Sequence, residues 1–213
     1  MRPSSHLRDE LCSLGTAFTP NELAYLALTS KVEFALRDKL AVRLSRRLRG
    51  HFYVSREWPR RSDLAIFDCN SVQEHGVHSR PCLLLEAKAM YSFDAIPTRV
   101  ESSSFERNYL PQLRTDLEKA RQLGSHTAQV YGLLLVTHPT GPVPRHLAGI
   151  VKYSRMINSR HMKLGPTKLW KEVCAHIKPR LRTLGAVVQG SWDAGTAFDV
   201  PCTVGYWLIR STV

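Results

Sequence analysis

The stretch Cys82-Leu-Leu-Leu-Glu-Ala-Lys88 is almost continuously apolar until it ends in two opposite charges. A short apolar run of this kind is typical of a strand that is buried on both faces of a sheet. Side chains alternate along a strand, so Glu86 and Lys88 should project from one face while Ala87 points to the other. The stretch therefore predicts a central strand with a carboxylate and an ammonium group side by side at its end.

The residues on either side predict an α/β layout around this strand, which we place at 82–87. Aromatic and β-branched runs predict further strands at 51–58, 64–67, 130–137, 184–189 and 203–209, with a polar loop at 70–80. Apolar residues at helical spacing predict a helix at 32–48 with Arg37 outside its apolar stripe, and a second helix at 105–123. A third helix is expected at 167–177.

Length and composition favour a single domain. The chain has 213 residues, of which 43% are hydrophobic, enough for a proper core. We divide it into an N-terminal segment at 1–18, a core at 19–139 and a basic C-terminal part of the same domain at 140–213. The 30 Lys and Arg against 18 Asp and Glu give a net charge of +12, so a polyanion, and nucleic acid before an anionic membrane, is the expected partner.

The positive charge is concentrated between residues 145 and 182, where Glu172 is the one acidic residue. This concentration favours a phosphate-binding face, although a basic face that only keeps the protein soluble remains an alternative. The residues expected to bind nucleic acid are Lys152, Arg155, Arg160, Lys163, Lys168 and Lys171.

The remaining sequence features bear on compartment and cofactors. The 5 cysteines are scattered, with no C-x-x-C pair, which points to a reducing cytoplasm. The sequence has neither an apolar run long enough to span a membrane nor the apolar region of an export signal. It also lacks the glycine-rich motifs that bind nucleotides, so we expect no nucleotide cofactor.

Asp63 and Glu86 are the residues with the clearest chemical meaning. If the strand at 64–67 pairs antiparallel with the one at 82–87, Asp63 comes alongside Glu86. Two carboxylates, with the Ala87 carbonyl as a third oxygen, would suit Mg²⁺ or Mn²⁺. Lys88 would then orient or deprotonate an attacking water. The alternative is a structural Glu-Lys pair beside an unrelated loop aspartate.

These residues resemble the signature of the PD-(D/E)XK nuclease superfamily, the restriction endonuclease-like fold: an acidic residue, a variable gap, then (D/E)-x-K. The resemblance covers roughly residues 19–139 and implies a central mixed sheet flanked by helices in the order α-β-β-β-α-β. It makes Asp63 and Glu86 metal ligands and Lys88 the catalytic lysine. It also assigns Glu33 on the first helix and Gln112 on the later helix to the site. The chain departs from the signature at Ser62, where the family has proline.

The resemblance implies a metal-dependent endonuclease that hydrolyses phosphodiester bonds, of DNA before RNA, in a defence, restriction or DNA-processing setting. Cutting both strands of a duplex calls for two active sites, so a homodimer or a larger nucleoprotein complex is the expected assembly. The alternatives are a catalytically silent nucleic-acid-binding module on the same fold and a subunit whose basic face docks a protein or RNA.

Overall fold

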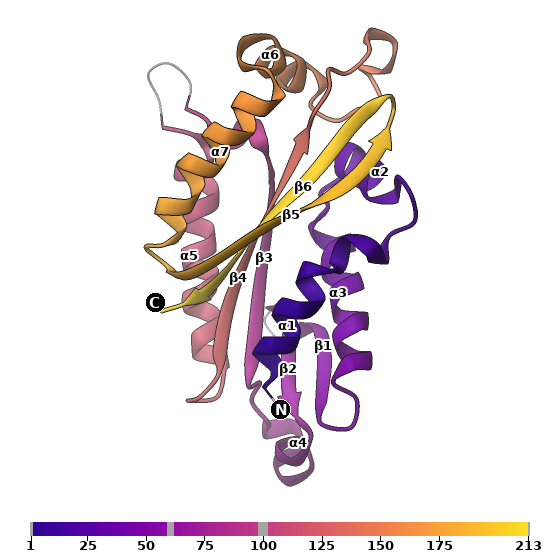
Figure 1. Ribbon diagram of the computed structural model, residues 1–213. Helices are drawn as coiled ribbons and strands as arrows, with labels where there is room; N and C mark the ends of the chain where they lie inside the picture. Colours follow the sequence, from indigo (N-terminus) through magenta and orange to yellow (C-terminus); the bar gives the residue numbers. More distant parts are fainter. Residues whose placement is uncertain (1, 59–61, 98–101, 213) are drawn as a thin grey trace.

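A six-stranded mixed sheet forms the centre of the protein, which we describe from a computed structural model covering residues 2–58, 62–97 and 102–212. The strand order is β1-β2-β3-β4-β6-β5 (Figure 1). β3 and β4 run parallel, and the other neighbours are antiparallel. The strands are β1 (Phe52–Trp58), β2 (Ser62–Asp68), β3 (Leu83–Tyr91), β4 (Gln129–Pro139), β5 (Gly185–Ala197) and β6 (Val200–Ser211).

Helices cover both faces of this sheet. The main helices are α1 (Pro3–Cys12), α2 (Glu22–Thr29), α3 (Glu33–Arg47), α5 (Leu110–Leu123), α6 (Ser154–Leu164) and α7 (Pro166–Leu181). The buried residues of α1, α2 and α3 pack on one face, and those of α5 and α7 pack on the other (Figure 1). The protein is therefore a three-layer α/β structure, and the two C-terminal strands belong to the same sheet as the rest.

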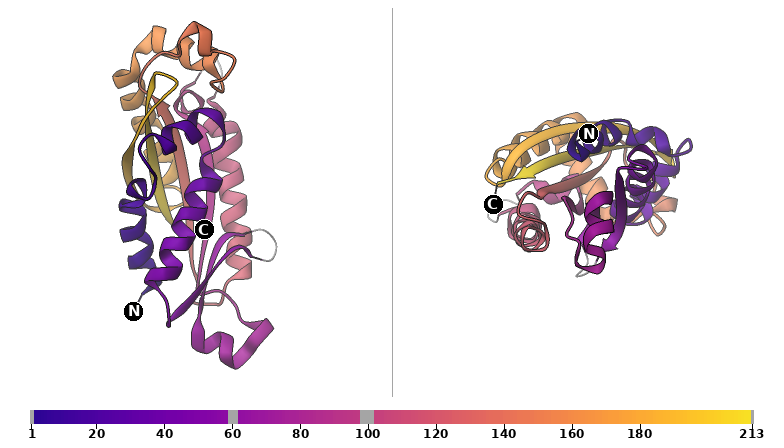
Figure 2. Two further views of the ribbon diagram at one scale, coloured as in Figure 1. Left: turned by 90° about the vertical axis from the view of Figure 1, so that its right-hand side faces the viewer. Right: turned by 90° about the horizontal axis from the view of Figure 1, so that it is seen from below.

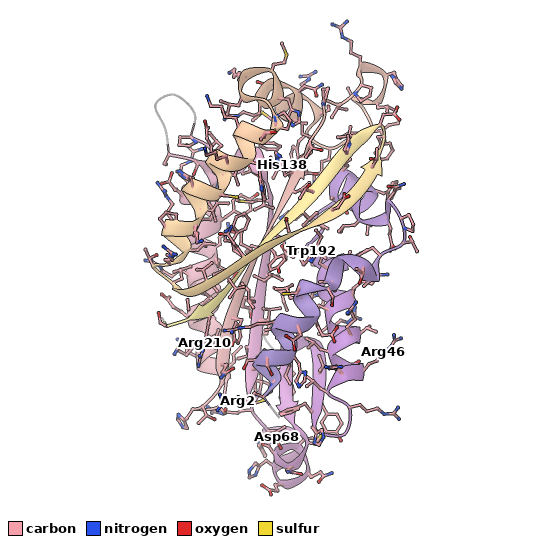
Figure 3. The ribbon with its side chains drawn as sticks, in the orientation of Figure 1. Arg2, Arg46, Asp68, His138, Trp192 and Arg210 are labelled. Atoms are coloured by element: carbon pink, nitrogen blue, oxygen red, sulfur yellow. The ribbon has the colours of Figure 1, made fainter. Side chains whose placement is uncertain are left out.

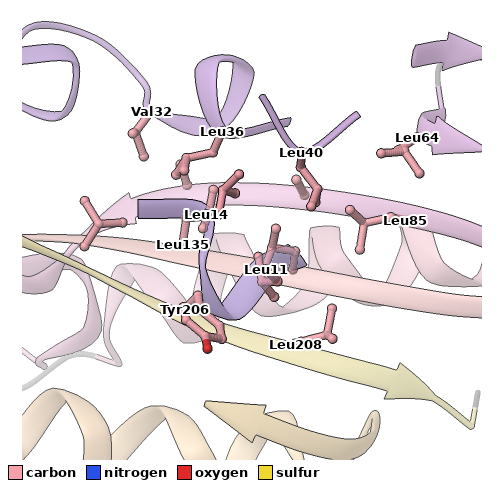
Figure 4. Close-up of a cluster of buried hydrophobic side chains, with 14 of the residues drawn as sticks. Leu11, Leu14, Val32, Leu36, Leu40, Leu64, Leu85, Leu135, Tyr206 and Leu208 are labelled. Carbon is pink, nitrogen blue, oxygen red and sulfur yellow. The ribbon is translucent and has the colours of Figure 1, made fainter. Parts of the chain in front are cut away.

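Alternation along β3 explains why this strand is central. Leu83 and Leu85 join the core beneath α1 and α3, whereas Leu84 joins the core beneath α5. Figure 4 shows Leu85 on the first of these faces, opposite Leu40 of α3. The sequence prediction of a strand buried on both faces is confirmed, and β3 continues four residues beyond the expected end.

The two ends of the molecule carry elements that the sequence did not predict. At one end, the expected loop at 70–80 contains the helix α4 (Cys69–His75), which projects opposite α6 (Figures 1 and 2). The prediction of a loop was wrong because Asp68 caps this helix, accepting hydrogen bonds from the N–H groups of Asn70 at 2.9 Å and Ser71 at 3.3 Å. At the other end, α6 begins after Tyr153.

Residues 2–18 of the N-terminal segment pack against the rest of the protein. α1 contributes Leu7 and Leu11 to the core, and the indole N–H of Trp192 on β5 lies 3.2 Å from the Leu11 carbonyl. The expected helix at 105–123 is divided into a π-helical turn at Phe105–Tyr109 and α5. In the part of the chain that the structure describes, no helix has both the length and the apolar character needed to cross a membrane.

Candidate active site

β2 and β3 pair over only a short distance, and this leaves one edge of β3 open. Within the described residues the pairing ends at Leu64 and Leu85, although β3 continues to Tyr91. The next residues on the two strands are Asp63 and Glu86, so antiparallel pairing brings these two carboxylates together as the sequence predicted. The site is therefore built where β2 leaves β3.

Carboxylates take the place of the missing strand along the open edge. The N–H of Ala87 donates to Asp63 Oδ2 at 2.8 Å, and the N–H of Ala89 donates to Glu33 Oε2 at 3.0 Å. The next N–H along this edge, that of Tyr91, donates to Asp94 Oδ2 at 2.9 Å. Unpaired N–H groups are costly to bury, so these bonds fix Asp63 and Glu33 against the strand.

A cavity of about 250 Å³ opens beside this edge on the face covered by α5. The residues that line it are Ser62, Asp63, Glu86, Lys88, Asp116, Lys119, Ala120 and Leu123. Three of the residues predicted from the sequence, Asp63, Glu86 and Lys88, thus share one cavity. Lys88 Nζ lies 2.7 Å from Asp116 Oδ2, so α5 adds a carboxylate that the sequence analysis did not assign.

Glu86 has the most perturbed carboxyl group of the site. Its side chain is buried, with the residue 7% exposed. The pKa of Glu86 is raised to about 8, mainly by burial and also by the negative charges of Asp63 and Asp116, while a hydrogen bond with Ser62 and the charge of Lys88 oppose the rise. A nearby cation would offset this accumulation of negative charge.

Arg37 of α3 contacts the second carboxylate oxygen of Asp63, Oδ1, while the first, Oδ2, accepts the hydrogen bond from the Ala87 N–H. Burial raises the pKa of Asp63, whereas the Ala87 N–H, Lys88 and Arg37 act to lower it. Arg37 Nη1 lies 3.5 Å from Asp63 Oδ1 and 3.1 Å from Glu57 Oε1. The prediction that Arg37 lies outside the buried stripe was wrong, because the residue is only 5% exposed. Its partners on β1 and β2 compensate for the burial of its charge.

The two remaining predicted residues differ in their placement. Glu33 lies beside the site: burial raises its pKa, the charge of Asp63 raises it further, and Lys88 opposes both. Gln112 is exposed on α5 and is not among the described residues that line the cavity. Asp116, one turn later, reaches Lys88 instead. Spacing in the sequence could have indicated Asp116, because it comes three residues after Leu113 and four before Ala120, which are both buried.

The donor atoms of this cavity fit a hard divalent cation. Asp63 and Glu86 offer carboxylate oxygens, and Mg²⁺ often takes only one or two carboxylates and keeps water as its other ligands. The N–H and C=O of one strand residue point to the same side, so the Ala87 carbonyl faces the open edge with its N–H. Among the described residues, no three His, Cys, Asp or Glu side chains form a complete metal-binding group on their own.

The predicted basic residues lie away from this cavity, on α6, α7 and the turn before α6. Arg155, Lys163, Lys168 and Lys171 are exposed, whereas Lys152 and Arg160 are half-buried. The helices that carry most of them, α6 and the beginning of α7, lie at one end of the molecule (Figures 1 and 2). Positive charge is not confined to this end, since Arg2, Arg46 and Arg210 are exposed elsewhere (Figure 3).

Comparisons with known proteins leave the family of the chain open. No protein-family model, curated protein or solved structure matches it.

Proposed function

We propose that this protein is a metal-dependent endonuclease that hydrolyses phosphodiester bonds of nucleic acid, with DNA as the favoured substrate. The observation that carries the proposal is the convergence of Asp63, Glu86 and Lys88 in one cavity at the open edge of β3. The resemblance to the PD-(D/E)XK superfamily adds support, since the order α3, β1, β2, β3, α5, β4 is the order that this family's core implies. Net positive charge suits the polyanionic substrate.

Each residue has a role that follows from its position. Asp63 and Glu86 would hold Mg²⁺ or Mn²⁺, with the Ala87 carbonyl as a further oxygen. The bound cation would stabilise charge on the scissile phosphate and lower the pKa of a water molecule. Lys88 donates hydrogen bonds and orients the attacking water. Glu33 lies near enough to Asp63 and Lys88 for its charge to act on both.

A second candidate is a catalytically silent nucleic-acid-binding module, or a subunit of a nucleoprotein complex, on the same fold. A specific observation favours it: Asp63 and Glu33 accept hydrogen bonds from backbone N–H groups of β3, and Lys88 forms an ion pair with Asp116. These contacts give the acidic residues and the lysine a structural role without catalysis. Such a module would bind nucleic acid and leave it intact.

The deciding experiment incubates the purified protein with supercoiled plasmid, linear duplex, single-stranded DNA and RNA, each with Mg²⁺, Mn²⁺ or EDTA. Cleavage that requires the metal and is abolished in Asp63→Asn and in Glu86→Gln would support the nuclease. Glu118→Gln, an exposed carboxylate on α5, is the matched control and should cleave like the wild type. Binding without cleavage under every condition would favour the silent module, and cleavage at the wild-type rate in either site variant would refute the metal assignment.

A further inference from the structure

Tyr153 presents a half-exposed aromatic ring at the basic end of the molecule. The residue comes directly before α6 in the left-handed conformation, with φ 58°, and it is 48% exposed. This backbone conformation is uncommon for a residue with a bulky side chain and persists only where the surroundings hold it. The Tyr153 ring meets Tyr91 edge to face at 5.1 Å and Phe93 at 5.8 Å. The fold therefore fixes an aromatic ring at the surface.

The ring lies at the end of β3 that follows the candidate active site. Tyr91, which supports it, is the last residue of β3 and follows Lys88 by three residues, roughly 10 Å along a strand. Tyr109 is close enough to both places to feel their charges. Burial raises its pKa to about 12, and the charges of Asp94 and Tyr153 at the end of β3 and of Glu33 beside the site contribute to the rise. The Tyr91 side chain points to the opposite face of the sheet from Lys88, where its hydroxyl donates to the Ala27 carbonyl of α2 at 2.7 Å. A chain bound at the cavity would therefore reach Tyr153 by passing around the open edge of β3.

The surroundings of Tyr153 are basic. Lys152 Nζ lies 5.1 Å from the centre of the Tyr153 ring, and Arg155 is exposed on the first turn of α6. An aromatic ring beside cations is the combination that binds single-stranded nucleic acid, because the ring stacks on a base and the cations neutralise phosphates. In a duplex each base is covered by its neighbours, so only an unpaired base offers its face to such a ring.

We propose that Tyr153 is a base-stacking platform for a single-stranded segment of the nucleic acid, with Lys152 and Arg155 contacting the adjacent phosphates. This inference rests on the proposed function and narrows it to substrates with an unpaired stretch beside the cleavage site. A membrane is the rival occupant, since Met156 and Met162 are exposed on the same basic helix.

The test measures binding without cleavage, by fluorescence anisotropy in EDTA, to a labelled single-stranded oligonucleotide and to a blunt duplex of equal length. Tyr153→Leu should weaken single-strand binding by about 10-fold or more, the usual size of one stacked base, and should change duplex binding little. Tyr153→Phe keeps the ring and should bind within about 2-fold of the wild type. Tyr53→Leu, an equally exposed tyrosine on β1, is the matched control.

Salt dependence separates stacking from charge. For a single strand the slope of log affinity against log salt changes by about 0.7 per phosphate contact, so Lys152→Ala should flatten the slope and Tyr153→Leu should leave it unchanged. Circular dichroism and thermal unfolding of each variant check that the packing around Tyr91 is kept. If Tyr153→Leu is folded and binds the single strand like the wild type, or loses the duplex equally, the platform is refuted.

The outcomes also keep this inference apart from the nuclease proposal. Wild-type protein that cleaves with Mg²⁺, while folded Tyr153→Leu binds unchanged, would refute only the platform. Protein that binds single strands through Tyr153 but never cleaves would refute the nuclease and leave the platform standing. Anionic phosphatidylserine vesicles form a further arm: binding to vesicles but not to the oligonucleotide would assign the basic end to a membrane and overturn the platform.

Discussion

Lys88 of β3 and Asp116 of α5 form an ion pair, with Nζ 2.7 Å from Oδ2. Burial acts to lower the pKa of Lys88, but the hydrogen bond and charge of Asp116, together with Glu33 and Asp63, outweigh it and raise this pKa above its usual value. Lys88 is therefore charged at neutral pH. A charged lysine orients a water molecule or stabilises negative charge; it does not accept a proton.

The first prediction concerns this pair. Lys88→Ala should lower the cleavage rate by about 10²-fold or more, the usual size of a positioned acid or base, while metal binding persists. Lys88→Arg should not restore the rate, because the planar guanidinium cannot take the position of the ammonium group beside Asp116. Asp116→Asn should lower the cleavage rate less than Lys88→Ala does, since the amide keeps an oxygen near Lys88. Single-turnover cleavage and calorimetric titration with Mn²⁺ measure the two effects, and a fully active Lys88→Arg would show that Lys88 supplies only charge.

The second prediction follows from the raised pKa of Glu86, about 8 in the folded protein against 4.5 for an ordinary glutamate. The folded state holds this proton more tightly than the unfolded state, so without metal the free energy of unfolding should fall as pH rises from about 4.5 to about 8. Glu86→Gln should remove this part of the pH dependence, whereas exposed Glu118→Gln should keep it. Urea unfolding in EDTA between pH 5 and 9 is the measurement, and equal slopes in all three proteins would contradict the assignment.

Metal binding should show the opposite trend. A carboxylate must lose its proton before it coordinates a cation, so Mg²⁺ affinity of the wild type should increase with pH until about 8 and then level off. Calorimetric titration across the same pH range tests this, and an affinity independent of pH would remove Glu86 from the ligands.

The sequence predicted the sheet because regular patterns mark its strands. The apolar run around Leu84 and the aromatic and β-branched runs of β1 and β4 depend only on near neighbours in the chain. The proximity of Asp63 and Glu86 was also predictable, since antiparallel strands joined by a single connection fix which ends meet. The helix α6 was not predicted, because only Ser154 and Ile157 of its residues are buried and no apolar stripe marks it.

Arg37 and Asp116 were missed for a different physical reason. Charged residues are usually exposed, so a prediction from the sequence places them outside the buried stripe of their helices. Both are exceptions because they also have partners in distant parts of the chain: Arg37 contacts Glu57 and Asp63 besides its neighbour Asp38, and Asp116 contacts Lys88. Gln112 was chosen on resemblance alone, whereas burial spacing on α5 favours Asp116.

The fourth prediction concerns the basic residues of α6. If this surface contacts a duplex backbone, each neutralised phosphate contributes about −0.9 to the slope of log affinity against log salt. Replacing Arg160 and Lys163 by alanine should flatten the slope by up to about 2 and weaken binding to all sequences alike. The double variant of Arg46 and Arg210, exposed far from α6 (Figure 3), is the control and should keep the wild-type slope. An unchanged slope in the α6 variant would mean that its charge faces solvent or a protein.

The last prediction concerns His138, at the end of β4 beneath α7. His138, labelled in Figure 3, is 2% exposed and stacks on Trp170 at 4.9 Å. Its Nδ1 is buried with no hydrogen-bond partner among the described residues. Burial, together with the charge of His161, lowers the pKa of His138 to about 4. In the unfolded state His138 therefore becomes protonated near pH 6.5, whereas in the folded state it becomes protonated only near pH 4.

The wild type should thus lose stability as pH falls from about 6.5 to about 4, with a loss on the order of 3 kcal/mol from this residue alone. His138→Gln, which cannot take up the proton, should lose correspondingly less over this interval, although it begins less stable because it disturbs the packing on Trp170. His126→Gln, at an exposed histidine, should follow the wild type. Urea unfolding at several pH values decides the matter: parallel curves for wild type and His138→Gln would mean that His138 is solvated, and that the end of β4 opens to water in solution.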